Sequence, residues 1–247
     1  MVLTQSAAAI AAPEARAALI PPPGHDLDRS VWASLAGHHA RFAQRHGLAV
    51  RYEPEVAPFV ALADPADARA WADAAELLGP EAAFSVTGAV SLPEGWEVQS
   101  QGESVQLVDT GLEARPCAEA VRLGADDVPE ILELVARAKP GPFRPRTVEL
   151  GTYLGIRRDG VLVAMAGERQ HPPGWTEISA VCTDEAFRGQ GLATALVRAV
   201  AAGIRERGET PFLHARGDNT NAIRLYESLG FTLRRRSLHT MVRLTAQ

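Results

Sequence analysis

The sequence predicts an α/β fold in which a mixed β-sheet carries helices on both faces. The first observation is the order of elements from residue 118 onward: strand, helix, three strands, helix, strand, helix and strand. The second is composition, because 46% of the 247 residues are hydrophobic and 22% are charged, as in ordinary globular proteins. The third is length, which suits one large domain or two of about 120 residues each. Together they exclude a disordered chain, a collagen-like fibre and a disulfide-stapled mini-protein.

Proline-rich and polar segments divide the chain. The run PPPG at residues 21–24 cannot continue a helix, so we expect residues 1–24 to form a flexible N-terminal tail. Residues 109–116 are polar and contain Pro and Gly, which predicts a domain boundary there. The expected domains cover residues 25–112 and 117–247, and each is long enough to bury its own core.

The N-terminal domain is expected to mix helices and strands. In order, these are a helix over residues 30–46, a strand over 48–52, a helix over 64–78, and strands over 83–89 and 96–108. Asp64 and Pro65 form a start signal for the second helix, and Gly79 ends it. His38 and His39 are neighbours within the first helix, and adjacent helical residues do not share a face, so we expect no metal site.

The C-terminal domain has a clearer pattern. Its expected elements are a strand over 118–123, a helix over 125–138, strands over 153–157, 161–168 and 176–183, a helix over 191–207, a strand over 211–215, a helix over 219–229, and one or two strands over 231–244. Asp159 and Gly160 form a hairpin signal between two of the strands. Gly230 is expected to end the last helix.

The charge balance argues against one class of partner. The 25 basic and 30 acidic residues leave a net charge of −5, whereas a non-specific nucleic-acid-binding protein needs a basic surface. Residues 1–115 are acidic overall and residues 116–247 slightly basic, so an anionic ligand is expected in the second half.

Cysteine use and the N-terminus favour the cytoplasm. Cys117 and Cys182 are too few for a disulfide framework or a zinc site. The N-terminus has no basic residue before Arg16, which argues against a secretory signal. No stretch approaches the roughly 18 apolar residues of a membrane span, so no membrane partner is expected.

The segment that follows the strand over residues 176–183 carries the chemistry. Arg188, Gly189, Gln190 and Gly191 stand directly before a predicted helix. The first N–H groups of a helix lack partners, glycine lets a phosphate approach the backbone, and arginine adds a cation. We therefore predict that residues 188–193, termed the phosphate loop, bind a pyrophosphate; the alternative is an ordinary strand-to-helix turn.

Two segments together resemble a known family. The sequence RGQGLA at residues 188–193 is similar to the [Q/R]-x-x-G-x-[G/A] signature of the GNAT N-acetyltransferase superfamily, and residues 219–231 resemble its N-x-x-A-I-x-x-Y-x-x-x-G-F segment. The resemblance covers residues 117–247 and extends to glycine N-acyltransferase-like proteins, in which a degenerate GNAT-like half precedes the active one. It implies a GNAT fold with a mixed, mostly antiparallel sheet flanked by helices, a degenerate GNAT-like half over residues 25–112, and acetyl-CoA as co-substrate.

The resemblance also assigns residues to the coenzyme. Backbone N–H groups of the phosphate loop would hold the coenzyme A pyrophosphate, and the strand before it would pair with the pantetheine arm. Asn219 would contact the coenzyme as well. The complete set is Val181, Cys182, Thr183, Arg188, Gly189, Gln190, Gly191, Leu192, Ala193 and Asn219.

The same resemblance implies an acid and leaves the base open. Tyr226 would protonate the departing thiolate, because a phenol with a pKa near 10 is protonated at neutral pH; the alternative is a core aromatic. Candidate bases are Glu177, Glu168 and His214, and a water chain could replace them. Strand alternation puts Glu177 on the face of Val181, which favours Glu177 over Glu168 and His214. The alternative for Glu177, a surface carboxylate on the strand, stays open.

Arg144 and Arg146 are candidates for binding the acceptor, because the segment between the first helix and the second strand borders the acceptor site in GNAT folds. Two arginines could hold a carboxylate in bidentate fashion, and the alternative is that they pair with local acids. The N-terminal domain would cover the sheet edge and shape this pocket.

These features predict an N-acetyltransferase that transfers an acetyl group directly from acetyl-CoA to the primary amine of a small molecule or amino acid. The alternatives are a protein N-terminal or side-chain amine as acceptor, and a non-catalytic acyl-CoA-binding sensor. The acidic first half favours a cationic acceptor, whereas the arginine pair favours an anionic one, so the acceptor is left open, as is a homodimer.

Overall fold

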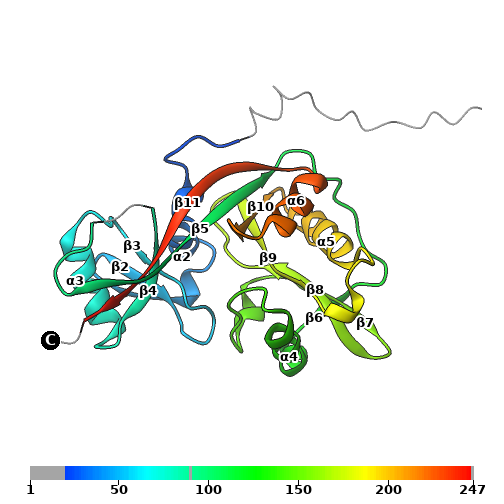
Figure 1. Ribbon diagram of the computed structural model, residues 1–247, viewed down its shortest axis with the longest axis horizontal. Helices are drawn as coiled ribbons and strands as arrows, with labels where there is room; N and C mark the ends of the chain where they lie inside the picture. Colours follow the sequence, from blue (N-terminus) through cyan, green and yellow to red (C-terminus); the bar gives the residue numbers. More distant parts are fainter. Residues whose placement is uncertain (1–19, 89–90, 246–247) are drawn as a thin grey trace, which may run out of the picture.

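A computed structural model describes residues 20–88 and 91–245, so most of the predicted tail over residues 1–24 lies outside the described residues (Figure 1). The helices are α2 (Ser30–Ala36), α3 (Ala68–Leu78), α4 (Val128–Ala138), α5 (Leu192–Glu206) and α6 (Thr220–Leu229). The strands are β1 (Ala43–His46), β2 (Ala49–Tyr52), β3 (Val60–Leu62), β4 (Ala83–Thr87), β5 (Trp96–Asp109), β6 (Val121–Leu123), β7 (Tyr153–Arg158), β8 (Val161–Glu168), β9 (Trp175–Thr183), β10 (Thr210–Arg216) and β11 (Phe231–Leu244).

Among the described residues, eight strands form one sheet in the order β4-β11-β5-β10-β9-β8-β7-β6. Its pairs are antiparallel except for β10 with β9, which run parallel. Apolar side chains of α5 and α6 pack on one face, and those of α4 pack on the other. The predicted fold class, a mixed and mostly antiparallel sheet with helices on both faces, is confirmed.

The N-terminal half contributes to this sheet as well as forming a small one. Strands β1, β2 and β3 pair with one another beside α3, whereas β5 lies between β10 and β11. Figure 1 shows β5 and β11 running side by side from the region of α3 to the region of α6. The division into two domains and the degenerate GNAT-like character of the first half stay predictions.

One predicted helix is much shorter than expected. The helix over residues 30–46 ends at Ala36, where Gly37 has backbone angles outside the helical region. The chain then turns through His38 and His39, forms the 3₁₀ helix η2 (Ala40–Phe42), and continues as β1 against β2. The pairing of β1 with β2 satisfies the backbone that a longer helix would have satisfied internally.

Among residues 20–88 and 91–245, no helix combines the length and apolar character needed to cross a membrane.

Candidate active site

The strands β9 and β10 separate in the middle of the main sheet. Their parallel pairing runs from Thr210 opposite Trp175 to Phe212 opposite Glu177, and it ends there. Strand β9 continues to Thr183, while β10 continues to Arg216 in contact with β5 instead. Beyond Glu177 the two facing edges therefore diverge, which leaves the β9 edge open to pairing with an extended ligand.

A bulge in β9 reverses the strand's alternation. Cys182 pairs with Met165 and Ser179 pairs with Gly167, so the two residues between them on β9 oppose one residue of β8. Ala180, within the bulge, has a φ of +54°, in the left-handed region.

The bulge corrects the predicted orientation of Glu177. Ile178 and Val181 both belong to the apolar cluster beneath α5, whereas Cys182 belongs to the cluster beneath α4. Because neighbours on a strand point to opposite faces, Glu177 lies opposite Ile178 and does not share the face of Val181. The expectation based on simple alternation is wrong for this pair.

The phosphate loop begins at the protein surface, directly before α5. Its first four residues, from Arg188 to Gly191, are exposed, and α5 begins at Leu192 with no side-chain cap. Gly189 and Gly191 have φ values of +78° and +76°, which glycine adopts without strain. A Cβ at either position would meet nothing within 4 Å, so open space lies beside the backbone. Free N–H groups at a helix N-terminus beside open space fit a pyrophosphate.

Neighbouring contacts hold the loop in place. Asp184 accepts hydrogen bonds from the Ala186 N–H at 3.1 Å and from Arg137 Nε at 2.9 Å. Leu192, the first residue of α5, is buried in the apolar cluster between this helix and the sheet, and Ala193 is half-buried. The Thr183 hydroxyl oxygen is buried and has no hydrogen-bond partner within the described part of the chain.

Helix α6 positions Asn219 and Tyr226. Asn219 is the N-cap, and its Oδ1 accepts a hydrogen bond from the Ala222 N–H at 3.1 Å. Tyr226 is buried on the inner side of the helix with its ring 6.2 Å from that of Phe231. Burial raises the pKa of Tyr226 to about 12, with a further contribution from Cys182. The phenol therefore keeps its proton at neutral pH.

Cys182 is a buried thiol in the cluster beneath α4. Burial raises its pKa to about 12. A protonated, buried thiol does not act as a nucleophile at neutral pH.

Glu177 occupies the point where β9 and β10 separate, and it is fully paired. Arg169 Nε and Nη2 donate to its two carboxylate oxygens at 2.8 Å and 2.6 Å, and His214 Nδ1 lies 2.7 Å from Oε1. Burial alone would raise the pKa of Glu177, but the charge of Arg169 and the hydrogen bonds from Arg169 and His214 outweigh it and hold the pKa at about 2. The group is an ionised carboxylate of low basicity.

The orientation of His214 follows from its neighbours. Gln106 Oε1 accepts from Arg234 at 2.7 Å, so its amide nitrogen faces the Leu27 carbonyl and His214 Nε2. That nitrogen is a donor, so His214 Nε2 accepts, and Nδ1–H donates to Glu177. The ring is thus held between Glu177 and Gln106, and the single lone pair of Nε2 is engaged by the Gln106 amide.

Glu168 and the predicted arginine pair have other roles. The buried Glu168 accepts from Arg207 Nη2 at 3.0 Å and from the Thr152 N–H at 3.2 Å. Arg146 donates to both oxygens of Glu149 at 2.7 and 2.9 Å and pairs with Glu53 as well. Arg146 is therefore not free to hold an acceptor carboxylate, and the alternative of pairing with local acids holds for it.

Arg144 is exposed, and its backbone N–H donates to Thr147 Oγ1 at 2.8 Å. It and Arg146 do not converge on one hydrogen-bonded group within the described residues.

The sequence analysis missed Arg169 as the partner of Glu177. Glu168 pairs with Ile178 across the β8–β9 hairpin, and the Arg169 N–H donates to the Glu177 carbonyl at 3.0 Å. The register of this hairpin would have indicated the pair, because residues opposite each other on antiparallel strands bring their side chains together.

The fold and site define an α/β protein with a split central sheet and an exposed, glycine-containing loop at the start of α5. Residues 153–240 match the FR47-like protein family. A solved structure assigned to the GNAT family of acetyltransferases, from Novosphingobium aromaticivorans, is 38% identical, has a TM-score of 0.82, and aligns over 90% of this chain and 99% of that chain. The chain belongs to the GNAT family.

Other relatives match less of the chain or only the fold. A GCN5-related N-acetyltransferase from Kribbella flavida is 19% identical, with a TM-score of 0.59 and coverage of 88% of this chain and 95% of that one. The N-alpha-acetyltransferase RimI of Mycobacterium tuberculosis is 37% identical over 90 residues, or 34% of this chain and 56% of that protein. A mycothiol acetyltransferase of Sanguibacter keddieii is 40% identical over 91 residues, or 34% of this chain and 29% of that protein. The matched segment spans less than two thirds of each of these two curated relatives.

Proposed function

We propose that this protein transfers an acetyl group from acetyl-CoA to the primary amine of a small molecule or amino acid, with both substrates bound together. The observation that carries the proposal is the separation of β9 from β10 beyond Glu177, beside the exposed phosphate loop. A split sheet beside a helix N-terminus can hold a long thioester with its anionic end on the loop. The thioester supplies the activated acetyl group.

The coenzyme would be held by backbone groups. Free N–H groups at the start of α5 would bind its phosphates, and Arg188 would add a positive charge. The edge of β9 from Val181 to Thr183 would pair with the pantetheine amides as an added strand. Holding the two reactants side by side supplies much of the catalysis, because it removes the entropy cost of their meeting.

Tyr226 would supply the proton for the departing sulfur. It lies on α6 in the apolar cluster against which Val181 of β9 packs, and its raised pKa keeps the phenol protonated throughout the physiological range. A protonated phenol beside a developing thiolate donates a hydrogen bond and then the proton.

We assign proton removal from the amine to His214, with Glu177 as its orienting partner. The low pKa of Glu177 and its bidentate bond to Arg169 make the carboxylate itself a poor proton acceptor. Glu177 instead holds Nδ1–H of His214, so Nε2 keeps its lone pair. The Gln106 amide occupies this lone pair at 3.0 Å and would have to release it to the incoming amine. In this arrangement the histidine is the general base, and the carboxylate orients its ring.

The N-terminal half supports a small acceptor. It contacts the side of the sheet that carries Arg169, where the guanidinium lies 5.0 Å from the centre of the Phe59 ring. Nearby, Thr147 Oγ1 donates to the Val56 carbonyl at 2.7 Å, and the His171 N–H donates to Ser34 Oγ at 2.7 Å. Such cover restricts the room for an extended peptide.

A protein N-terminal amine is the second candidate acceptor, and the likeness to an N-alpha-acetyltransferase favours it. A panel of amino acids, small amines and peptides, incubated with acetyl-CoA and followed by mass spectrometry, separates the two. Acetylated peptides without acetylated small amines would reject the small-molecule proposal.

The test of the mechanism is Tyr226→Phe. We expect kcat to fall by about 100-fold or more, because general acid catalysis is lost while the ring remains. The affinity for acetyl-CoA, measured by calorimetry, should stay close to that of the wild type.

Tyr153→Phe is the matched control, because the Tyr153 hydroxyl is buried without a hydrogen-bond partner among the described residues. We expect this variant to keep most of its kcat. An unchanged kcat in Tyr226→Phe would remove Tyr226 from the mechanism, and a wild-type protein that binds no acetyl-CoA would reject the proposed function itself.

A further inference from the structure

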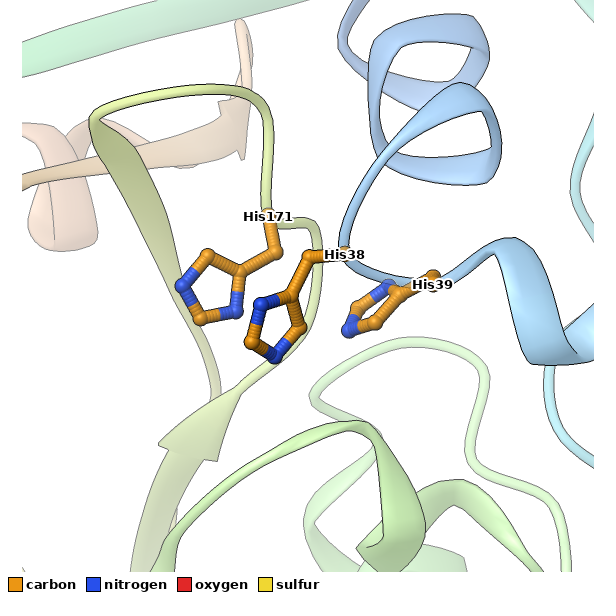
Figure 2. Close-up of side chains that lie close together, drawn as sticks. All are labelled: His38, His39 and His171. Atoms are coloured by element: carbon orange, nitrogen blue, oxygen red, sulfur yellow. The ribbon is translucent and has the colours of Figure 1, made fainter.

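Three histidines meet at the junction between the N-terminal half and the β8–β9 connection. His38 and His39 come from the turn after α2, and His171 comes from the loop between β8 and β9 (Figure 2). One ring nitrogen of each lies within 4.8 Å of those of the other two. Imidazole nitrogens are ligands for zinc, copper, nickel and iron, so this cluster has the donor set of a transition-metal site.

His171 carries the strongest indication of a ligand. Its ring is 5% exposed, and Nε2 lies 2.8 Å from both carboxylate oxygens of Glu209. The carboxylate fixes a proton on Nε2 and leaves a lone pair on Nδ1. That Nδ1 is buried and has no hydrogen-bond partner within residues 20–88 and 91–245. A buried polar atom without a partner is costly, and a metal ion would satisfy it.

The hydrogen bond from His171 Nε2–H to Glu209 is also typical of histidines that bind a metal through their other ring nitrogen. Ligating histidines donate their other N–H to a carboxylate, a carbonyl or a water, which orients the ring and makes it a better ligand. Thr176 Oγ1 donates to Glu209 Oε2 at 2.6 Å and so fixes the carboxylate in turn.

His39 is fully buried, and both of its ring nitrogens have partners: Nδ1 lies 2.9 Å from the Tyr52 hydroxyl and Nε2 lies 3.0 Å from the Leu150 carbonyl. Because a carbonyl only accepts, Nε2–H donates to Leu150 and Nδ1 accepts from Tyr52. To bind a metal through Nε2, the ring must take its other tautomer, with Nδ1–H donating to the Tyr52 oxygen, and give up the contact with Leu150.

His38 supplies an adjustable ligand and an opening to solvent. It is exposed and stacks on His171, with ring centroids 3.9 Å apart and an interplanar angle of 26°. Two nitrogens on one tetrahedral zinc ion lie roughly 3.3 Å apart, so a rotation of this exposed ring is needed to close the site.

We propose that His38, His39 and His171 bind one Zn²⁺ ion, with water as the fourth ligand. The proposal departs from the expectation of no metal, which rested on His38 and His39 lying in one helix; they lie in a turn, where adjacent side chains can converge. The ion would join the segment after α2 to the β8–β9 connection, and it would therefore stabilise the contact between the two halves.

The test uses the untagged full chain, stripped of metal with a chelator and titrated with Zn²⁺ by calorimetry. We expect one Zn²⁺ per chain and a higher midpoint of thermal unfolding in the presence of the ion. Replacement by Co²⁺ should give the visible absorption of a tetrahedral cobalt site. None of these readouts needs coenzyme or acetyl transfer, so they are independent of the proposed function.

Two variants and a control assign the site. His38→Ala removes an exposed ligand, and we expect at least about a tenfold loss of Zn²⁺ affinity. Glu209→Gln replaces the charged partner of His171 by a neutral amide, which makes the ring a poorer ligand, and we expect a loss of about 10–100-fold. His46→Ala, an exposed histidine on β1 outside the cluster, should bind Zn²⁺ as the wild type does.

The absence of stoichiometric Zn²⁺ binding by the wild type would overturn the proposal. So would an affinity in His38→Ala equal to that of the wild type, because an exposed alanine there leaves the fold intact. A loss in His46→Ala as large as that in His38→Ala would also overturn it, since binding would then be spread over surface histidines.

Discussion

The phosphate loop and the Glu177 cluster lie toward the two ends of the part of β9 that does not pair with β10, and they differ in how their polar groups are used. The Glu177 cluster consists of Glu177, Arg169, His214 and Gln106. The loop from Arg188 to Gly191 is exposed, and the helix behind it has no side-chain cap. Glu177 is fully buried, and both of its carboxylate oxygens have charged or polar partners.

This difference separates two kinds of polar site. Backbone donors that lack partners at an open surface are ready to bind a ligand, and they cost little while they are solvated. A buried carboxylate without partners would cost several kcal/mol, so a buried acid is either paired or neutral. The loop is therefore expected to matter for coenzyme affinity, and Glu177 first of all for stability.

The largest effect is expected for Glu177→Gln. The change leaves Arg169, whose side chain is 16% exposed, without its carboxylate, and breaking a buried pair costs roughly 3–5 kcal/mol of unfolding free energy. Urea unfolding measures the loss, with the exposed Glu185→Gln as a control that should stay near wild type. A loss below about 1 kcal/mol would show that Arg169 finds another partner, and Glu177 would then not matter first of all for stability.

The same pair predicts a pH dependence. The pKa of Glu177 is lowered from 4.5 to about 2 in the folded protein. A lowered folded-state pKa contributes stability that is present above pH 4.5 and is lost as the pH falls toward 2. The wild type should therefore lose more stability than Glu177→Gln between these two pH values, as measured by urea unfolding at each pH.

A smaller effect is expected for Gly191→Ala in the phosphate loop. Alanine at a φ of +76° costs about 1–2 kcal/mol, so the loop should relax and its N–H groups should no longer converge. Coenzyme A affinity, measured by calorimetry, should fall by about tenfold, the equivalent of about 1.4 kcal/mol.

Gly208→Ala provides the matched control at the other end of α5. Gly208 has a φ of +79°, and a Cβ there also meets nothing within 4 Å, so the cost to stability is the same. Coenzyme affinity should be unchanged in this variant. Equal losses of affinity in both variants would mean that the loop acts only through general stability.

Sequence patterns predicted the position of the phosphate loop far better than the contacts of the Glu177 cluster. The loop depends on consecutive residues, and glycines before an amphipathic helix specify its conformation locally. The Glu177 cluster depends on Gln106 of β5, His214 of β10 and Arg169, which directly follows β8. It also depends on a bulge that reverses the face of β9. One extra residue in a strand changes which face every later side chain occupies, and nothing in the pattern of Ser179 to Thr183 marks it.

The N-terminal half illustrates the same limit. The apolar spacing of Val31, Leu35 and Phe42 predicted one helix, and Leu35 and Phe42 are indeed buried in one cluster. They reach that cluster from α2 and from η2, because Gly37 ends the helix and β1 pairs with β2. Burial was predictable from hydrophobicity, whereas the local conformation was decided by tertiary pairing.

The smallest effect on stability and activity is expected for Arg146→Ala. This variant removes ion pairs at the surface, whereas Glu177→Gln removes one in the interior. Its ion pairs with Glu149 and Glu53 are partly exposed, with 36% of the arginine side chain accessible, so solvent screens them. Thermal unfolding should change little, and the KM for the acceptor should change by less than about twofold, because exposed pairs contribute little. Steady-state kinetics with Arg144→Ala, an exposed arginine in the same segment, provide the matched comparison. A large rise in the KM for the acceptor in Arg146→Ala alone would mean that Arg146 leaves Glu149 and Glu53 to bind the acceptor. An ion pair at the surface would then not exclude an arginine from ligand binding.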